Sequence, residues 1–119
     1  KRKGMEGQSH RDLKERTMQF SVASIRFYRN LPQTTEAQVC GKQFLRSATS
    51  VGANTRSAFR GRSPREFKAK PGVVIEEADE CGFWLDLMKR TGIVESEPAE
   101  PLLLEASELV SIFTTVVKR

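Results

Sequence analysis

Hydrophobic residues recur every three or four positions along most of the chain, and no stretch alternates apolar and polar residues as a half-buried strand does. This pattern predicts four helices, over Asp12–Asn30, about Glu36–Arg60, Pro64–Arg90 and a last helix with an apolar stripe from Leu102 to Val117. Because only short connections separate them, consecutive helices should run antiparallel. The predicted fold is therefore all-α, an antiparallel up-down-up-down four-helix bundle.

Proline and short polar residues mark where the predicted helices begin and end. Pro32 ends the first helix, and Thr35 followed by Gln38 is typical of a capping box that opens the second. Pro71 lies about two turns inside the third helix, where a proline removes a backbone hydrogen bond and clashes with the preceding turn. We therefore expect a kink or a break near Lys70.

The second predicted helix separates its basic residues from its small ones. At about 100° per residue, four bases share an arc of roughly 80°: Lys42, Arg46, Arg56 and Arg60. The opposite side is apolar and unusually small, with Gly41, Ala48 and Gly52 between larger residues. Glycine inside a helix costs roughly 0.5–1 kcal/mol relative to alanine, and close contact with another helix is the usual compensation. The sequence leaves open whether that helix belongs to the same chain or to another subunit.

Charge is divided unevenly along the 119 residues. Residues 1–72 hold 16 Lys and Arg against 5 Asp and Glu, a balance of +11, and residues 73–119 hold 4 against 10, a balance of −6. The two balances add to the net charge of +5. We expect an anionic partner for the first part, and a partner protein or a second subunit for the acidic part.

The basic arc of the second helix is the candidate binding site. We interpret it as a stripe that follows phosphates, extended past the end of the helix by Arg62 and Arg65. The alternative is a solvated face that pairs with acids of a neighbouring helix, for which Glu36 and Glu66 are the local candidates. No DNA-reading motif is present, so we expect contacts with the backbone of RNA or DNA and no base code. The predicted nucleic-acid-binding residues are Lys42, Arg46, Arg56, Arg60, Arg62 and Arg65.

Residues suited to catalysis or metal binding are few. His10 is the only histidine and has no fixed partner for acid-base, nucleophilic or zinc chemistry. The acids between Glu76 and Asp86 are more typical of a solvated or interface-facing stripe than of a metal site. Trp84 is expected in the core or at a subunit interface, and not as a platform for bases. The sequence therefore indicates neither an enzyme nor a cofactor.

Size and cysteine content suit a small intracellular domain. With 38% hydrophobic residues, the chain can form one domain, which we place at residues 10–119 after a flexible polar segment at residues 1–9. No apolar run approaches the roughly 18 residues of a membrane-spanning helix. Cys40 and Cys81 lie inside apolar patterns and are expected to be reduced. We expect a cytoplasmic protein.

Three stretches resemble one protein family: DLKERTMQF, LPQTTEAQVCGKQFLRSATSVGANTRSAF and EEADECGFWLDLM. The family comprises bacterial four-helix-bundle proteins, once called ribosomal, that are encoded in intervening sequences of 23S rRNA genes. The resemblance covers about Asp12 to Val117 and implies an antiparallel bundle that commonly forms a homopentameric ring. The fold is also similar to the accessory protein of diversity-generating retroelements, a basic pentamer that works with a reverse transcriptase and binds nucleic acid.

Two functions fit these observations. The first is a basic oligomer that binds the backbone of RNA or DNA without catalysis, as an accessory to a ribonucleoprotein or a reverse transcriptase. The second is a protein-protein interaction scaffold of the same family with no direct nucleic-acid role.

Overall fold

Four helices make up the computed structural model. Its backbone is described for residues 2–60 and 64–118, and its side chains for residues 12–60 and 70–118. The helices are α1 (Arg2–Arg29), α2 (Thr35–Ala58), α3 (Pro64–Arg90) and α4 (Ser96–Lys118), and the described backbone contains no strand. The prediction of an all-α chain with four helices is confirmed.

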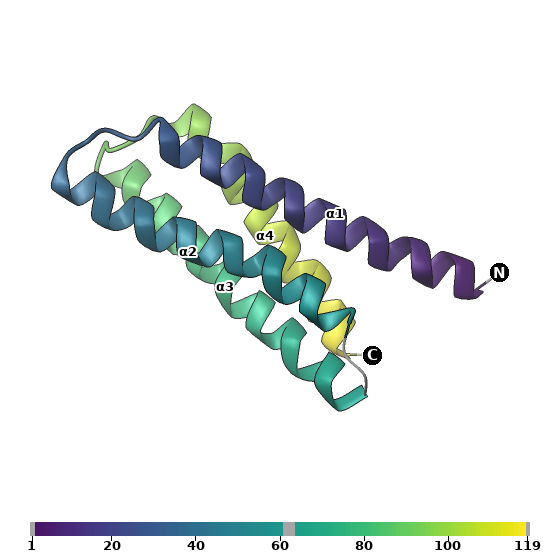
Figure 1. Cartoon of the computed structure of the whole chain (residues 1–119). Coiled ribbons are helices and arrows are strands. Elements are labelled where there is room, and N and C mark those ends of the chain that lie inside the picture. The colour runs from purple at the N-terminus through teal and green to yellow at the C-terminus, as the bar shows by residue number, and fades with distance from the viewer. Residues whose placement is uncertain (1, 61–63, 119) are drawn as a thin grey trace.

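Each helix packs against the next one in the chain (Figure 1). The result is an elongated body with extents of 49 × 23 × 21 Å. α2 lies between α1 and α3, whereas α1 touches α4 only lightly. Figure 1 shows the N-terminal part of α1 diverging from the other helices. α1 is therefore held mainly by its contact with α2.

One arginine of α1 forms ion pairs with two carboxylates of α4. Arg16 donates from Nε to Glu105 Oε2 at 2.6 Å and from Nη2 to Glu105 Oε1 at 2.8 Å. The same Nη2 donates to Glu108 Oε1 at 2.7 Å. The hydrogen bond to Glu105 is the largest cause that raises the pKa of Arg16; burial opposes it, and Glu108 adds to it. This bidentate pair closes the bundle where apolar contact is sparse.

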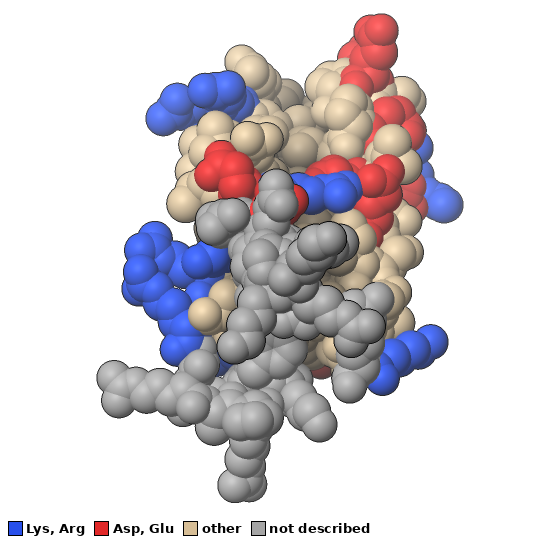
Figure 2. Space-filling model, turned by 90° about the vertical axis from the view of Figure 1, so that its right-hand side faces the viewer, with Lys and Arg blue, Asp and Glu red and all other residues tan. Residues whose placement is uncertain are grey.

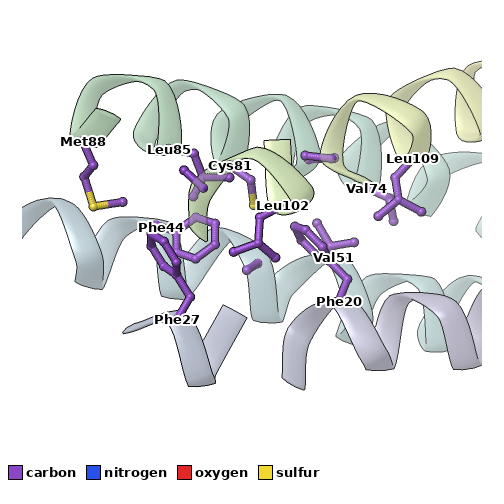
Figure 3. Close-up of a cluster of buried hydrophobic side chains, with 14 of the residues drawn as sticks. Phe20, Phe27, Phe44, Val51, Val74, Cys81, Leu85, Met88, Leu102 and Leu109 are labelled. Atoms are coloured by element: carbon purple, nitrogen blue, oxygen red, sulfur yellow. The ribbon is translucent and has the colours of Figure 1, made fainter. Parts of the chain in front are cut away.

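A single apolar cluster fills the interior (Figure 3). Phe27 of α1 and Phe44 of α2 meet edge to face with ring centroids 5.5 Å apart. α3 and α4 add buried side chains spaced three, four or seven apart along the cluster: Val74, Cys81, Leu85, Met88, Leu102 and Leu109. This spacing places them on one face of each helix, so burial follows from the sequence pattern. Val117, at the end of the predicted stripe, is exposed.

α1 begins earlier than the sequence pattern indicates. The helix starts at Arg2, so the prediction of a start near Asp12 is wrong. Residues 2–11 contain no proline, and their two glycines cost about 1 kcal/mol each relative to alanine, which does not end a helix. The division into a flexible segment at residues 1–9 and a domain at residues 10–119 stays a prediction.

The start of α2 also differs from the predicted capping box. Thr34 is the cap, and its hydroxyl oxygen accepts a hydrogen bond from the backbone N–H three residues later at 3.4 Å. Gln38 binds elsewhere: its Nε2 donates to the Pro32 carbonyl at 2.9 Å, and its Oε1 accepts from the Tyr28 hydroxyl at 2.7 Å. The predicted capping box from Thr35 to Gln38 is therefore wrong. The Gln38 side chain instead links the connection between α1 and α2 to the end of α1.

α3 continues through Pro71. The helix is unbroken from Pro64 to Arg90, so the break expected near Lys70 is wrong. A proline inside a helix costs about 3 kcal/mol. Pro71 is fully buried, so the packing of its ring in the interior offsets that cost.

α1 and α2 approach each other closely at the glycines of α2. A Cβ atom on Gly52 would lie 2.7 Å from Ser21 Oγ and 3.3 Å from the Thr17 carbonyl oxygen, and one on Gly41 would overlap Leu31. The close contact expected for these glycines is therefore made inside one chain. Buried hydroxyls on α1 bind carbonyl oxygens, so they add no unsatisfied polar group to this contact.

Replacing Gly52 with alanine should lower the free energy of unfolding. The new methyl group would displace Ser21, whose hydroxyl donates to the Ala48 carbonyl at 3.0 Å. Overpacking costs about 1–3 kcal/mol, more than the helix propensity that alanine gains. Gly82→Ala is the control, because its Cβ would meet nothing within 4 Å, and it should raise stability by about 0.5–1 kcal/mol. If urea denaturation gave the same change in the free energy of unfolding for Gly52→Ala and Gly82→Ala, the close approach of α1 to Gly52 would be contradicted.

The two thiols should differ in reactivity. Cys40 is partly exposed, whereas burial raises the pKa of Cys81 to about 12, with a smaller contribution from the nearby carboxylates of Glu77 and Glu80. At pH 8 a thiol reagent should label Cys40 in the folded protein and label Cys81 only after unfolding, because the thiolate is the reactive form. Mass spectrometry of labelled peptides measures this difference, and rapid labelling of Cys81 in the folded protein would refute it.

Candidate nucleic-acid interface

The four predicted bases of α2 occupy different surroundings. Lys42, Arg46, Arg56 and Arg60 are all exposed. The opposite side of α2 is buried at Ala37, Gly41, Phe44, Ala48, Val51, Thr55 and Ala58. The helix therefore has one buried and one basic side, but contacts with neighbouring helices divide the bases into separate groups.

Arg46 is paired with carboxylates of α3. Its Nη1 donates to Glu77 Oε2 at 3.2 Å, and its Nη2 donates to Glu80 Oε1 at 2.5 Å. The hydroxyls of Ser47 and Ser50 donate to Glu80 and Glu77, each at 3.0 Å. The contact thus joins α2 to α3 through two carboxylates and four donors.

These contacts shift the pKa values of Arg46 and Glu80. The hydrogen bond to Glu77, and after it that to Glu80, raises the pKa of Arg46. Burial of the Glu80 carboxylate favours its neutral form, but hydrogen bonds from Ser47, Trp84 and Arg46 outweigh burial and lower the pKa of Glu80. Both groups are charged at neutral pH, and each neutralises the other.

At Arg46 the alternative holds, in which the basic arc pairs with acids of a neighbouring helix. The partners are Glu77 and Glu80 of α3, and not the local candidates Glu36 and Glu66. Periodicity along α2 does not reveal which residues of α3 lie beside it. Arg46 is consequently a weaker candidate for phosphate binding than the other bases of α2.

A groove of about 680 Å³ lies between α1 and the C-terminal half of α2. Its described lining residues are Lys14, Glu15, Met18, Ser21, Thr49, Gly52, Ala53, Arg56 and Arg60. Lys14, Arg56 and Arg60 have no ion pair with any described residue, and Glu15 is the one carboxylate in that lining. The groove is therefore a concave surface with an excess of positive charge.

The structure adds Lys14 to the predicted residues. Gly52 lies against Thr17 and Ser21, so Lys14, one turn before Thr17 on α1, comes to the level of Arg56. The small residue at position 52 could have revealed this neighbour if the facing helix had been known to be α1. Sequence reasoning did not identify that helix.

The remaining predicted bases are not brought into the groove. Lys42 lies 14 residues before Arg56, about 21 Å along a helix. Arg62 and Arg65 lie outside the residues whose side chains are described.

Figure 2 shows a group of Lys and Arg atoms on the left, with most Asp and Glu atoms at the upper right. Further Lys and Arg atoms lie at the right edge and the lower right of this view.

Other candidate chemistry finds little support in the described part of the chain. Those residues contain no group of three His, Cys, Asp or Glu side chains arranged to hold a metal ion. They also include no helix with both the length and the hydropathy needed to cross a membrane. Trp84 is half-buried against the core, and its Nε1 donates to Glu80 Oε1 at 3.4 Å, as befits a packing role.

The described backbone is that of an all-helical protein with four helices, in which Arg46 joins α2 to two carboxylates of α3. Residues 10–115 match the family described as 23S rRNA-intervening sequence protein, and the chain belongs to this family. A protein with unknown function from the S23 ribosomal protein family of Bacteroides thetaiotaomicron has a similar crystal structure. Its sequence identity is 31%, over 90% of this chain and 99% of that chain, and the TM-score is 0.83. No curated protein matches the sequence.

The family resemblance is therefore confirmed, and the structure explains the residues that carry it. The stretches FLRSATSVGAN and EADE contain Arg46, Ser47, Ser50, Glu77 and Glu80, which form the contact between α2 and α3. Similarity to the accessory protein of diversity-generating retroelements stays a prediction.

Replacing Glu80 with glutamine should weaken the contact between α2 and α3 by about 1 kcal/mol at pH 7, a modest loss because both partners are partly exposed. The effect should depend on pH. A lowered pKa in the folded state contributes stability above the unfolded value of 4.5, and this contribution is lost as the pH falls through the folded value. Urea denaturation at pH 7 and pH 3 measures it. Glu95→Gln, in the exposed connection before α4, is the control. A stability difference between wild type and Glu80→Gln that stays the same at both pH values would contradict this role.

Proposed function

We propose that this protein binds the phosphate backbone of RNA or DNA and has no catalytic activity. The observation that carries the proposal is the groove between α1 and α2, where Lys14, Arg56 and Arg60 converge without neutralising partners among the described residues. Each such cation can replace a condensed counterion on a phosphate, and the release of that counterion favours binding. Lys42, Arg62 and Arg65 are proposed as further contacts for a longer nucleic acid.

The proposed assembly is an antiparallel up-down-up-down bundle that forms a homopentameric ring in the cytoplasm. The register of contacts supports the antiparallel arrangement: Gly52 lies beside Thr17 and Ser21, whereas Gly41 lies beside Leu31. Membership of the family supports the ring through the resemblance described above. A ring would repeat the groove around its axis and strengthen binding through several simultaneous contacts. A reverse transcriptase or another protein is a proposed partner of the assembly.

The second candidate is a scaffold that binds only proteins. Exposed apolar side chains on three helices favour it: Val39 on α2, Phe83 on α3 and Leu104 on α4. A contiguous patch of such side chains marks a protein contact, whereas single ones are ordinary on a protein surface. A scaffold of this kind would show no salt-dependent affinity for nucleic acid, so one binding experiment separates the two functions.

Replacing both Arg56 and Arg60 with glutamine should weaken RNA binding about tenfold or more at low salt. Two lost phosphate contacts should also reduce the slope of log affinity against log salt by about 1.4–1.8. The control is Arg90→Gln with Lys118→Gln, which removes the same charge from α3 and α4. Mobility-shift titrations of a structured RNA at two salt concentrations measure both quantities. Equal losses in the two double variants would show that only net charge matters and would remove the groove from the proposal.

A further inference from the structure

An exposed strip of α1 continues from the groove towards the other end of the bundle. Met18, Val22 and Ile25 are all exposed although they are apolar, and the exposed Arg29 follows one turn later. Together with Lys14 these residues share an arc of about 80° on the helix. α1 therefore presents an apolar strip with one cation at each end.

α2 supplies a second cation at the far end of this strip. Gly41 lies against Tyr28 and Leu31, so its neighbour Lys42 lies at the same level of the bundle as Arg29. Neither Lys42 nor Arg29 has an ion pair with a described residue. The outer face of α1 and α2 thus has the groove cations at one end, Arg29 and Lys42 at the other, and apolar side chains between. We call this surface the α1–α2 track.

The two kinds of side chain on the track match the two faces of an unpaired strand. A single strand exposes phosphates, which bind cations, and base faces, whose contact with aliphatic side chains removes apolar surface from water without a sequence code. A duplex stacks its bases inside, so it presents phosphates, sugars and base edges but no base faces, on a stiff convex cylinder. The axes of packed helices lie about 8–10 Å apart, so a groove between two of them suits one strand better than two.

We infer that the α1–α2 track binds single-stranded nucleic acid in preference to duplex, with phosphates at its two basic ends and bases on Met18 and Ile25. This inference rests on the proposed function and narrows its ligand to one class. Exposure of Met18 at 49% beside Lys14 and Arg56 is the juxtaposition that carries it. Charge alone would attract either form of nucleic acid, whereas the apolar strip offers a contact only to unpaired bases.

Fluorescence anisotropy with matched ligands tests the inference. The probes are a labelled single strand of about 12 nucleotides, one of about 4 nucleotides, and a duplex made from the longer strand and its complement. The full chain should bind the longer strand at least fivefold more tightly than the duplex. Met18→Ala should weaken binding of the single strand about fivefold and leave duplex binding unchanged, because it removes apolar surface and no charge. Leu104→Ala, at a more exposed apolar residue on α4, is the control and should change neither.

The two ends of the track give a second measurement. Arg29→Gln with Lys42→Gln should weaken binding of the longer strand and leave the shorter strand unaffected, since the shorter one occupies the groove alone. Arg56→Gln with Arg60→Gln should weaken both strands. Each double variant removes two positive charges. A difference between their effects on the longer and the shorter strand therefore shows which end of the track each strand occupies.

The outcomes separate this inference from the proposed function. If neither strand nor duplex binds, the proposed function fails, and the inference with it. If the Arg56 and Arg60 variant loses affinity but the duplex binds as well as the single strand, or Met18→Ala has no effect, only the inference fails. Light scattering on Met18→Ala tests whether Met18 lies at a contact between subunits. A change in oligomeric mass with equal losses for strand and duplex would assign Met18 to a subunit contact and overturn the inference.

Discussion

The arrangement of this protein depends on how closely α1 and α2 approach each other. Gly41 and Gly52 leave no room for a side chain against α1, and the Ser21 hydroxyl reaches across to the backbone of α2. Because α1 touches α4 only lightly, this contact and the Arg16 pair hold α1 in place. The same contact sets the register that brings Lys14 beside Arg56. Packing of small residues in the interior thereby determines which charges meet on the surface.

The arginines of this fold have different roles. Arg16 and Arg46 each pair with two carboxylates of another helix, so their charge stabilises the bundle and is locally neutralised. Arg56 and Arg60 lie against α1, which offers only Glu15 in the groove, and they keep their charge available for a ligand. A count of basic residues therefore overstates the binding surface. The distinction depends on which helix each arginine faces.

Sequence reasoning succeeded where the signal is periodic and failed where it depends on a neighbouring helix. The spacing of Phe44, Ala48 and Val51 predicted the buried face of α2, and the structure buries all three. The break at Pro71 was wrong because burial in the interior overrides a local preference. The role of Arg46 was missed for a different reason. Its partners lie about thirty residues away in sequence, and only the register between helices brings them together.

The residues on which the family resemblance was recognised in this chain are largely used for packing. In FLRSATSVGAN, Arg46, Ser47 and Ser50 contact α3, and Gly52 contacts α1. The relative of unknown function has a similar fold, with a TM-score of 0.83 at 31% identity, and a similar fold does not require a shared ligand. Function must instead be argued from side chains that the packing leaves free. In this chain these are the cations and the exposed apolar strip of the α1–α2 track, which packing constrains least.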